Sequence, residues 1–276
     1  MAYLEGTAIE IVHRDIPRGH VRVALFDFDG TLSLIRQGWQ EVMQSLMVAI
    51  LLQTPRHESV DELRAAATEL IDRLTGEQTV NQMAGLAQEV ARRGGRPANP
   101  QEYKRQYLDR LRERIEPRIA ALKSGQVVPD EALVAGSRAL LESLRSWGIT
   151  CYLASGTDEV AVRGEATALG IAGYFAEIHG ARDGDPRASK NAVIEQIMRE
   201  HSLRGDAKRF VAFGDGRVEV ESTKRVGGLA VGVASNEVKR RGVNDRKREH
   251  LIQAGADIIV PDFDEHKELI AFLFGL

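Results

Sequence analysis

The amino-acid sequence predicts an α/β protein in which helices cover both faces of a parallel sheet, and three observations lead to this fold class. Apolar runs rich in β-branched residues alternate with helical patterns along most of the chain. Residues 38–123 interrupt this alternation, because their pattern is helical throughout. Short polar motifs follow directly after several of the apolar runs. We therefore expect a three-layer α/β/α core domain with an inserted all-α helical domain.

The predicted strands are short apolar segments, and the first of them is expected as an additional edge strand before the core begins. They cover residues 8–12, 21–26, 149–154, 174–178, 209–213, 229–233 and 257–260. The helices predicted between and after them cover residues 130–147, 158–169, 190–201 and 265–274. Strands that alternate with helices imply right-handed crossovers, which place helices on both faces of the sheet.

The insertion is predicted as four helices near residues 38–53, 58–74, 79–93 and 100–123. Turn residues separate them at Thr54-Pro55, at Thr75-Gly76 and at residues 94–97. The expected domain organisation is therefore a core domain of residues 1–36 and 124–276 and a helical domain of residues 37–123.

The composition excludes several classes of protein. Hydrophobic residues make up 43% of the 276 residues and charged residues 28%, which is typical of a globular protein. The formal net charge of −3 gives no electrostatic reason to expect nucleic acid or a membrane surface as a partner. The single cysteine, Cys151, cannot form an internal disulfide and favours a reducing compartment. Since we find neither a signal peptide nor an apolar run long enough to span a bilayer, we expect a cytoplasmic protein, whose oligomeric state the sequence leaves open.

A basic run at residues 239–248 is interpreted as solvated surface. Glycine and asparagine interrupt it, and it contains no aromatic side chains on which bases could stack. Because the run follows the predicted strand at residues 229–233, an arginine from it that reaches a bound substrate stays open as an alternative.

The most informative motif is DFDGTLS at residues 27–33, which places Asp27 and Asp29 at the exit of a predicted strand. In an open parallel sheet, ligands bind at the carboxyl ends of the strands. Gly30 with Thr31 can turn the backbone sharply there and offer N–H groups to a ligand. The alternative is a simple Asp-rich turn that ends in glycine.

Two further motifs also lie where the sheet presents its ligands. Ser155-Gly156-Thr157 follows a predicted strand, and it can cap the next helix and also offer a hydroxyl and N–H groups to a phosphate, since the two roles are compatible. Lys190 stands at the start of a predicted helix, where a cation opposes the positive end of the helix dipole. Such a mildly unfavourable position indicates a function, although a solvated lysine is the simpler interpretation.

The last motif is GDGRVE at residues 214–219, after another predicted strand. Asp215 and Glu219 are four residues apart, so they share a face if a helix starts just past Gly216. The alternative is a capping aspartate followed by a surface glutamate.

Taken together and in this order, the four motifs resemble the signature motifs of the haloacid dehalogenase-like (HAD) superfamily of hydrolases. The first is residues 27–33, the second begins at Ser155, the third is Lys190 and the fourth is residues 214–219. The resemblance covers essentially the whole chain. It implies a Rossmann-like core with a type 1 helical cap between the first two motifs, most like the phosphoglycolate phosphatase and β-phosphoglucomutase branch. Glu219 departs from the pattern, since many members have a second aspartate there.

The resemblance implies phosphoryl transfer through a covalent intermediate. Asp27 would attack phosphorus and form an aspartyl-phosphate. Asp29 would protonate the leaving alcohol and then deprotonate the attacking water. The acid at Asp29 argues against a true dehalogenase, and the DFDGT sequence argues against an ion-pumping ATPase. A phosphonate-cleaving member would need a cap lysine, and the insertion offers only Lys104 and Lys123.

The same resemblance implies a magnesium site and a phosphate site. Oxygen ligands without nearby His or Cys favour Mg²⁺, with a metal set of Asp27, Asp29 through its backbone carbonyl, Asp215 and waters, and Glu219 at most indirectly. The groups expected to hold the phosphoryl oxygens are Ser155, Lys190 and the backbone N–H groups of Gly30 and Gly156.

The substrate is the least determined part of the prediction. Arg36 and Trp39 follow the first motif and could face the phosphate or a ring of the substrate, or Trp39 could instead anchor the first cap helix in the core. We expect a Mg²⁺-dependent phosphatase acting on a small phosphorylated metabolite such as a sugar phosphate or phosphoglycolate. The alternatives are a phosphomutase of the β-phosphoglucomutase type and a HAD protein that binds a phospho-ligand without turnover.

Overall fold

The computed structural model describes residues 2–276, and a mainly parallel sheet of eight strands lies at their centre. The strand order is β1-β2-β8-β7-β6-β3-β4-β5, with antiparallel pairing only at β1–β2 and β2–β8. The strands are β1 Ala2–Tyr3, β2 Glu10–Ile11, β3 Val23–Phe26, β4 Thr150–Asp158, β5 Phe175–Ala181, β6 Phe210–Gly214, β7 Leu229–Val233 and β8 Ile258–Val260.

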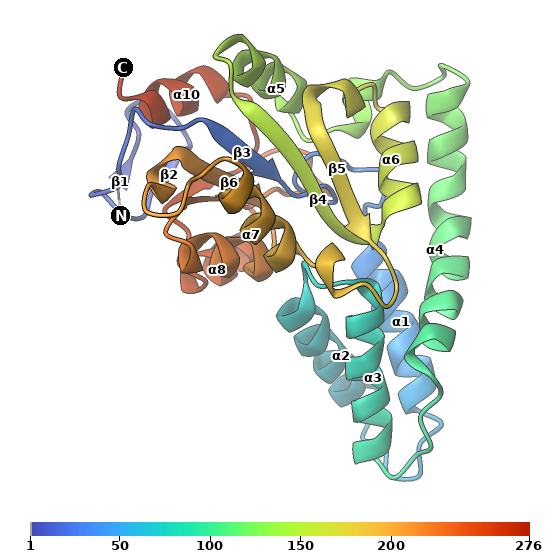
Figure 1. Ribbon diagram of the computed structural model, residues 1–276. Coiled ribbons are helices and arrows are strands. Elements are labelled where there is room, and N and C mark those ends of the chain that lie inside the picture. The colour runs from blue at the N-terminus through green and yellow to red at the C-terminus, as the bar shows by residue number, and fades with distance from the viewer. Residues whose placement is uncertain (1) are drawn as a thin grey trace.

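Helices cover both faces of this sheet, with α5 and α10 together on one side and α7 and α8 on the other (Figure 1). The helices are α1 Trp39–Leu51, α2 Val60–Leu74, α3 Thr79–Arg92, α4 Pro100–Lys123, α5 Ser137–Ser146, α6 Glu159–Ala168, α7 Lys190–Glu200, α8 Arg217–Arg225, α9 Asp245–Gln253 and α10 His266–Phe274. Single 3-10 turns lie at η1 Pro129–Ala132, η2 Ala172–Tyr174, η3 Pro186–Ala188 and η4 Ala207–Arg209.

The central strand β3 explains the layering, because its successive side chains point to opposite faces. Val23 and Leu25 belong to the apolar cluster that contains the buried side chains of α7. Ala24 and Phe26 belong to the larger cluster that contains those of α5 and α10. A strand that is apolar on both faces is typical of a sheet buried between two helical layers. The predicted fold class, a three-layer α/β/α core with a parallel sheet, is confirmed.

The helix predicted over residues 130–147 is wrong in its first part, since α5 begins only at Ser137. The backbone before it pairs with the loop after β3 instead: Leu34 N donates to the Ala132 carbonyl and Val134 N to the Leu32 carbonyl. Gly136 then turns with φ +73°, and a Cβ there would lie 2.0 Å from a main-chain oxygen of the segment before α10. Tertiary hydrogen bonds therefore replace the first turns of the helix.

Two further differences concern the first predicted strand and the basic segment at residues 239–248. The strand expected at residues 8–12 forms only over Glu10–Ile11, as β2. It is not the edge strand of the sheet, because β1 pairs with its outer side. Helix α9 forms in the basic segment that the sequence analysis interpreted only as solvated surface.

Helices α1 to α4 lie together beyond one end of the sheet (Figure 1). Their buried side chains, such as Leu46, Leu70 and Leu111, belong to the same apolar cluster as one face of the sheet. Helix α4 returns toward the sheet and runs beside α6 (Figure 1). Its Lys104 is buried and donates to Asp158 at 2.6 Å and to Asp183 at 2.7 Å, which ties the helical segment to the end of β4 and to the loop after β5. None of the described helices is long and apolar enough to cross a membrane.

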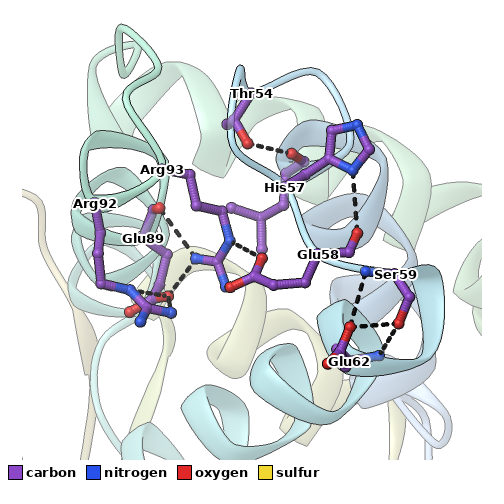
Figure 2. A network of polar contacts seen from close by, with 9 residues as sticks. Thr54, His57, Glu58, Ser59, Glu62, Glu89, Arg92 and Arg93 are labelled. Carbon is purple, nitrogen blue, oxygen red and sulfur yellow. Dashed lines mark hydrogen bonds and ion pairs between the residues drawn. The ribbon is translucent and has the colours of Figure 1, made fainter.

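Polar contacts join the segments at the far tip of these helices (Figure 2). Ser59 and Glu62 form a capping box at the start of α2. Arg93, at the end of α3, has a side chain only 3% exposed and pairs with Glu58 and Glu89. These contacts join the loop before α2 to the end of α3.

Candidate active site

The first motif forms a tight loop at the carboxyl end of β3. The Phe28 carbonyl accepts hydrogen bonds from the N–H groups of Leu32 and Ser33, at 2.9 and 2.8 Å. Gly30 turns with φ +78°, and a Cβ there would lie 2.3 Å from Asp215 Oδ2, so only glycine fits between the loop and that carboxylate. The loop brings the first and fourth motifs into contact.

The backbone of this loop is already hydrogen-bonded internally, which corrects one expectation. Gly30 N–H donates to the Ser33 carbonyl at 2.9 Å, so it is not free to hold an anion as the sequence analysis expected. Thr31 is fully buried, and its hydroxyl has no hydrogen-bond partner among the described residues. Both residues shape the loop from behind the cavity.

Asp27 is buried beside Lys190, whose Nζ lies 2.7 Å from Asp27 Oδ1 and also pairs with Glu219. Ser189 caps α7, so Lys190 is the first residue of the helix. Burial raises the pKa of Asp27 to about 6, against the lowering effect of Lys190 and with a further rise from Asp215. Glu219, 2% exposed on α8, therefore acts as the second counter-charge of Lys190.

Asp29 lies in a different environment from Asp27. Thr157 Oγ1 donates to its Oδ2 at 2.9 Å, and Arg36 Nε lies 3.7 Å from its Oδ1, which has no hydrogen-bond partner among the described residues. Burial raises the pKa of Asp29 to about 7, although Arg36 opposes the rise. Arg36 is itself buried and makes a bidentate pair with Glu165 on α6, with a shortest contact of 2.7 Å. Its guanidinium is thus held by carboxylates of the protein.

The second motif lies beneath a loop of the helical segment. Ser155 Oγ accepts from Thr157 N–H at 3.1 Å, and the N-cap position of α6 is Asp158. A Cβ at Gly156 would lie 2.4 Å from the Glu77 carbonyl, so the loop between α2 and α3 passes directly over this glycine. The close approach explains why glycine occupies the position.

One cavity collects most of the predicted residues. It has a volume of about 50 Å³. Among the predicted residues, it is lined by Asp27, Asp29, Arg36, Trp39, Ser155, Gly156, Lys190 and Asp215. The α2–α3 loop and Tyr107 of α4 complete the wall, whereas Gly30, Thr31 and Glu219 lie outside the lining. Since one buried water needs about 10–15 Å³, the space is comparable to a phosphoryl group.

Lys247 is a site residue that the sequence analysis missed. Its Nζ lies 2.6 Å from Asp215 Oδ2 and 2.7 Å from Glu237 Oε1. Burial lowers the pKa of Lys247, but the two carboxylates outweigh this effect and raise it above its ordinary value. The interpretation of residues 239–248 as solvated surface is therefore wrong for this lysine. A signal was present, because Asn244 caps α9 and places Lys247 in the first turn of a helix, as at Lys190.

The residues present fit a magnesium ion by charge and by donor type. Six carboxylates form ion pairs with three cations, Lys190, Lys247 and Arg36; the carboxylates are Asp27, Asp29, Glu165, Asp215, Glu219 and Glu237. A bound phosphate would add further negative charge, so an additional cation is favourable. Across residues 2–276, no three His, Cys, Asp or Glu side chains are arranged to hold a metal ion by themselves. Main-chain carbonyl and water ligands, which Mg²⁺ commonly uses, would have to complete the set.

A family model adds to this geometry. The model described as haloacid dehalogenase-like hydrolase matches residues 21–227. The chain belongs to this family. The match spans all four motifs and confirms the resemblance found in the sequence, so this HAD-like protein is an enzyme of the hydrolase type. A search of curated proteins found no match.

Solved structures share the fold of this HAD-like hydrolase at low sequence identity. A predicted phosphoglycolate phosphatase from Haemophilus somnus 129PT has a TM-score of 0.60 and 17% identity, over 91% of this chain and 98% of that chain. A predicted phosphatase from Clostridium acetobutylicum has a TM-score of 0.57 and 20% identity, over 91% and 99%. A β-phosphoglucomutase from Clostridium difficile has a TM-score of 0.59 and 12% identity, over 91% and 99%.

Proposed function

We propose that this HAD-like hydrolase is a Mg²⁺-dependent phosphatase that cleaves a phosphomonoester of a small metabolite. The observation that carries the proposal is the pair of aspartates at the end of β3. Asp27 and Asp29 line one small cavity, yet different partners surround them. Two carboxylates in different environments are suited to different tasks, one as nucleophile and one as acid and base.

In this mechanism, Asp27 is the nucleophile. A carboxylate oxygen forms a bond to phosphorus while the bond from phosphorus to the alcohol oxygen breaks, which gives an aspartyl-phosphate. Lys190, bonded to Asp27 Oδ1, supplies positive charge where the phosphoryl oxygens gather negative charge. Ser155 and Gly156, from the last part of β4, lie on the same cavity wall and hold the phosphoryl oxygens.

Asp29 is the proton donor and acceptor. With a pKa raised to about 7, its carboxyl group keeps a proton in a large fraction of molecules near neutral pH. It gives this proton to the leaving alcohol, and it then takes a proton from the water that hydrolyses the aspartyl-phosphate. Thr157 and Arg36 hold the carboxyl group in place for both steps.

A magnesium ion would be held by Asp27, Asp215, the Asp29 main-chain carbonyl and waters, and when bound it would neutralise charge on the transferred phosphoryl group. Glu219 pairs with Lys190, which supports an indirect role for this residue.

We further propose that residues 37–123 act as a cap domain over a core domain of residues 1–36 and 124–276. The α2–α3 loop supports this role, because it passes over Gly156 and a Cβ at Gly76 would lie 2.8 Å from Glu219 Oε1. A cap in this position excludes bulk water from Asp27 during attack.

The test is phosphate release from a panel of small phosphomonoesters with Mg²⁺. We expect turnover that EDTA abolishes and that Asp27→Asn reduces by about three orders of magnitude or more, since the nucleophile is lost. Asp61→Asn, whose side chain is 90% exposed on α2, is the matched control and should keep full activity. No turnover of any ester would overturn the proposal, whereas turnover of sugar phosphates only with a bisphosphate present would indicate a phosphomutase.

A further inference from the structure

A groove beside the catalytic cavity shares Arg36 and Thr157 with the mechanism above, but its apolar walls have no part in that mechanism. It lies between α4 and α6, which run side by side (Figure 1), and has a volume of about 350 Å³. Its apolar lining consists of Leu108, Leu111, Ile115 and Ile119 from α4 and Val160, Ala161 and Gly164 from α6, beside eight polar or charged residues that include Asp158 and Glu165. Val160 is 88% exposed to solvent. Because burial of an aliphatic side chain is favourable, a ligand that covered Val160 would gain binding free energy.

The groove and the catalytic cavity meet at three residues, Arg36, Thr79 and Thr157, which line both. The catalytic cavity, at about 50 Å³, is comparable to a phosphoryl group alone. The alcohol part of any larger substrate therefore needs an adjoining space. The groove, at about 350 Å³, is within the usual size of a small-molecule pocket.

The position of Asp29 indicates which adjoining space is used. In the proposed mechanism, Asp29 protonates the leaving oxygen, so the alcohol lies on the side of this carboxyl group. The two side chains that hold Asp29, Thr157 and Arg36, are among the three that also line the groove.

A second adjoining cavity is less suitable. It measures about 130 Å³ and meets the catalytic cavity at Thr75 and Asp215, on the side of the expected metal ligand. Its lining includes Arg217, Arg246 and Lys247, which would be poor partners for an apolar group.

We propose that the groove between α4 and α6 binds the alcohol part of the phosphomonoester, and that this part is an alkyl chain or an aromatic ring. The proposal rests on the phosphatase function proposed above. Aliphatic side chains on both walls favour an alcohol part without further hydroxyl groups, since hydroxyls buried there would lose hydrogen bonds to water. Arg112, Glu116 and Lys123 also line the groove and can contact a polar end of the chain.

The test is a series of n-alkyl phosphates from ethyl to octyl, whose leaving groups have nearly the same chemistry. For the wild type we expect kcat/KM to rise about two- to fourfold for each added methylene, until the groove is full. The variant Gly164→Leu fills the groove. A Cβ at Gly164 meets no atom within 4 Å, and replacing a glycine inside a helix favours folding.

In Gly164→Leu we expect the rise with chain length to disappear, with octyl phosphate losing at least about tenfold in kcat/KM through a higher KM, while ethyl phosphate changes by less than about twofold. Gly173→Leu is the matched control: Gly173 is also open, but it lies in η2 outside the groove, and its series should match the wild type.

Equal kcat/KM for ethyl and octyl phosphate in the wild type would overturn the groove proposal and leave the phosphatase function standing. A chain-length dependence that persists in Gly164→Leu would overturn it in the same way. Failure to hydrolyse any ester, phosphoglycolate included, would overturn both proposals together.

Discussion

Two lysines contact aspartates of the signature motifs, one fully buried and one partly buried, and they differ in the aspartate that they contact. Lys190 lies between Asp27 and Glu219, and its side chain is 3% exposed. Lys247 lies between Asp215 and Glu237, and its side chain is 16% exposed. Each lysine therefore neutralises an aspartate of a signature motif together with one glutamate.

The difference lies in the acid that each lysine contacts. Lys190 contacts the proposed nucleophile, so its charge remains beside the reacting phosphoryl group. Lys247 contacts the expected metal ligand, so its charge repels a cation bound there. We therefore expect the same local arrangement to favour the proposed chemistry at Lys190 and to weaken metal binding at Lys247.

The largest expected effect in this comparison is on catalysis in Lys190→Met. Because a preorganised positive charge is lost beside the transferred phosphoryl group, kcat for phosphate release should fall by about 100- to 1000-fold. A steady-state assay at saturating substrate and Mg²⁺ measures this, with circular dichroism to verify folding. A folded variant with wild-type kcat would show that Lys190 only balances the charges of Asp27 and Glu219.

The next effect is expected on metal affinity in Lys247→Met. Removing this cation leaves Asp215 and Glu237 uncompensated, so Mg²⁺ should bind about tenfold more tightly, and its addition should raise the melting temperature more than in the wild type. Titration calorimetry with Mg²⁺ alone measures the affinity. Lys239→Met, an exposed lysine on the same segment, is the control and should bind as the wild type does. Weaker Mg²⁺ binding in Lys247→Met would mean that the lysine mainly positions Asp215.

Arg93 is a cation far from the candidate site, so its replacement is expected to change the stability of the protein and not its activity. Arg93 at the helical tip is buried between Glu58 and Glu89, whose side chains are partly exposed (Figure 2). Arg93→Met should lower the free energy of unfolding by about 1–2 kcal/mol, because the partly exposed partners recover water. Urea unfolding measures the loss, and kcat should remain unchanged. A proportional loss of kcat would show that the tip influences the site.

The smallest expected effect is the pH dependence of an ion pair near the groove. Arg182 and Arg163 outweigh burial and lower the pKa of Glu159 from 4.5 to about 2. A carboxylate whose pKa is lower in the folded state stabilises the protein above its unfolded pKa, and this stabilisation is lost as the pH falls from about 4.5 toward 2. Glu159→Gln should therefore cost about 0.5–1 kcal/mol at pH 7 and progressively less below pH 4.5. Urea unfolding of the wild type and of Glu159→Gln at pH 7 and pH 3 measures this difference. A loss of stability that is the same at both pH values would show that it does not come from the ionised Glu159 carboxylate.

The sequence by itself determined the α/β class, the four inserted helices and the assembly of Asp27, Asp29, Lys190 and Asp215 around one cavity. These predictions succeeded because hydrophobic periodicity is a local property, and because parallel strands present their carboxyl ends at one edge of the sheet. Asp27, Asp29 and Asp215 follow such strands closely and therefore meet at this edge, whereas Lys190 was indicated by its place at the start of a helix.

Only the tertiary structure decided the rest. The N–H of Gly30 is used within its own loop, and the helix predicted from residue 130 starts at Ser137 because its backbone pairs with residues 32–34. Lys247, on the helix after β7, reaches both Asp215 and Glu237, and the groove exists because α4 returns beside α6. Each of these features depends on hydrogen bonds or charges between groups that are far apart along the chain. Such tertiary interactions can override the local sequence pattern, and they cannot be predicted from that pattern.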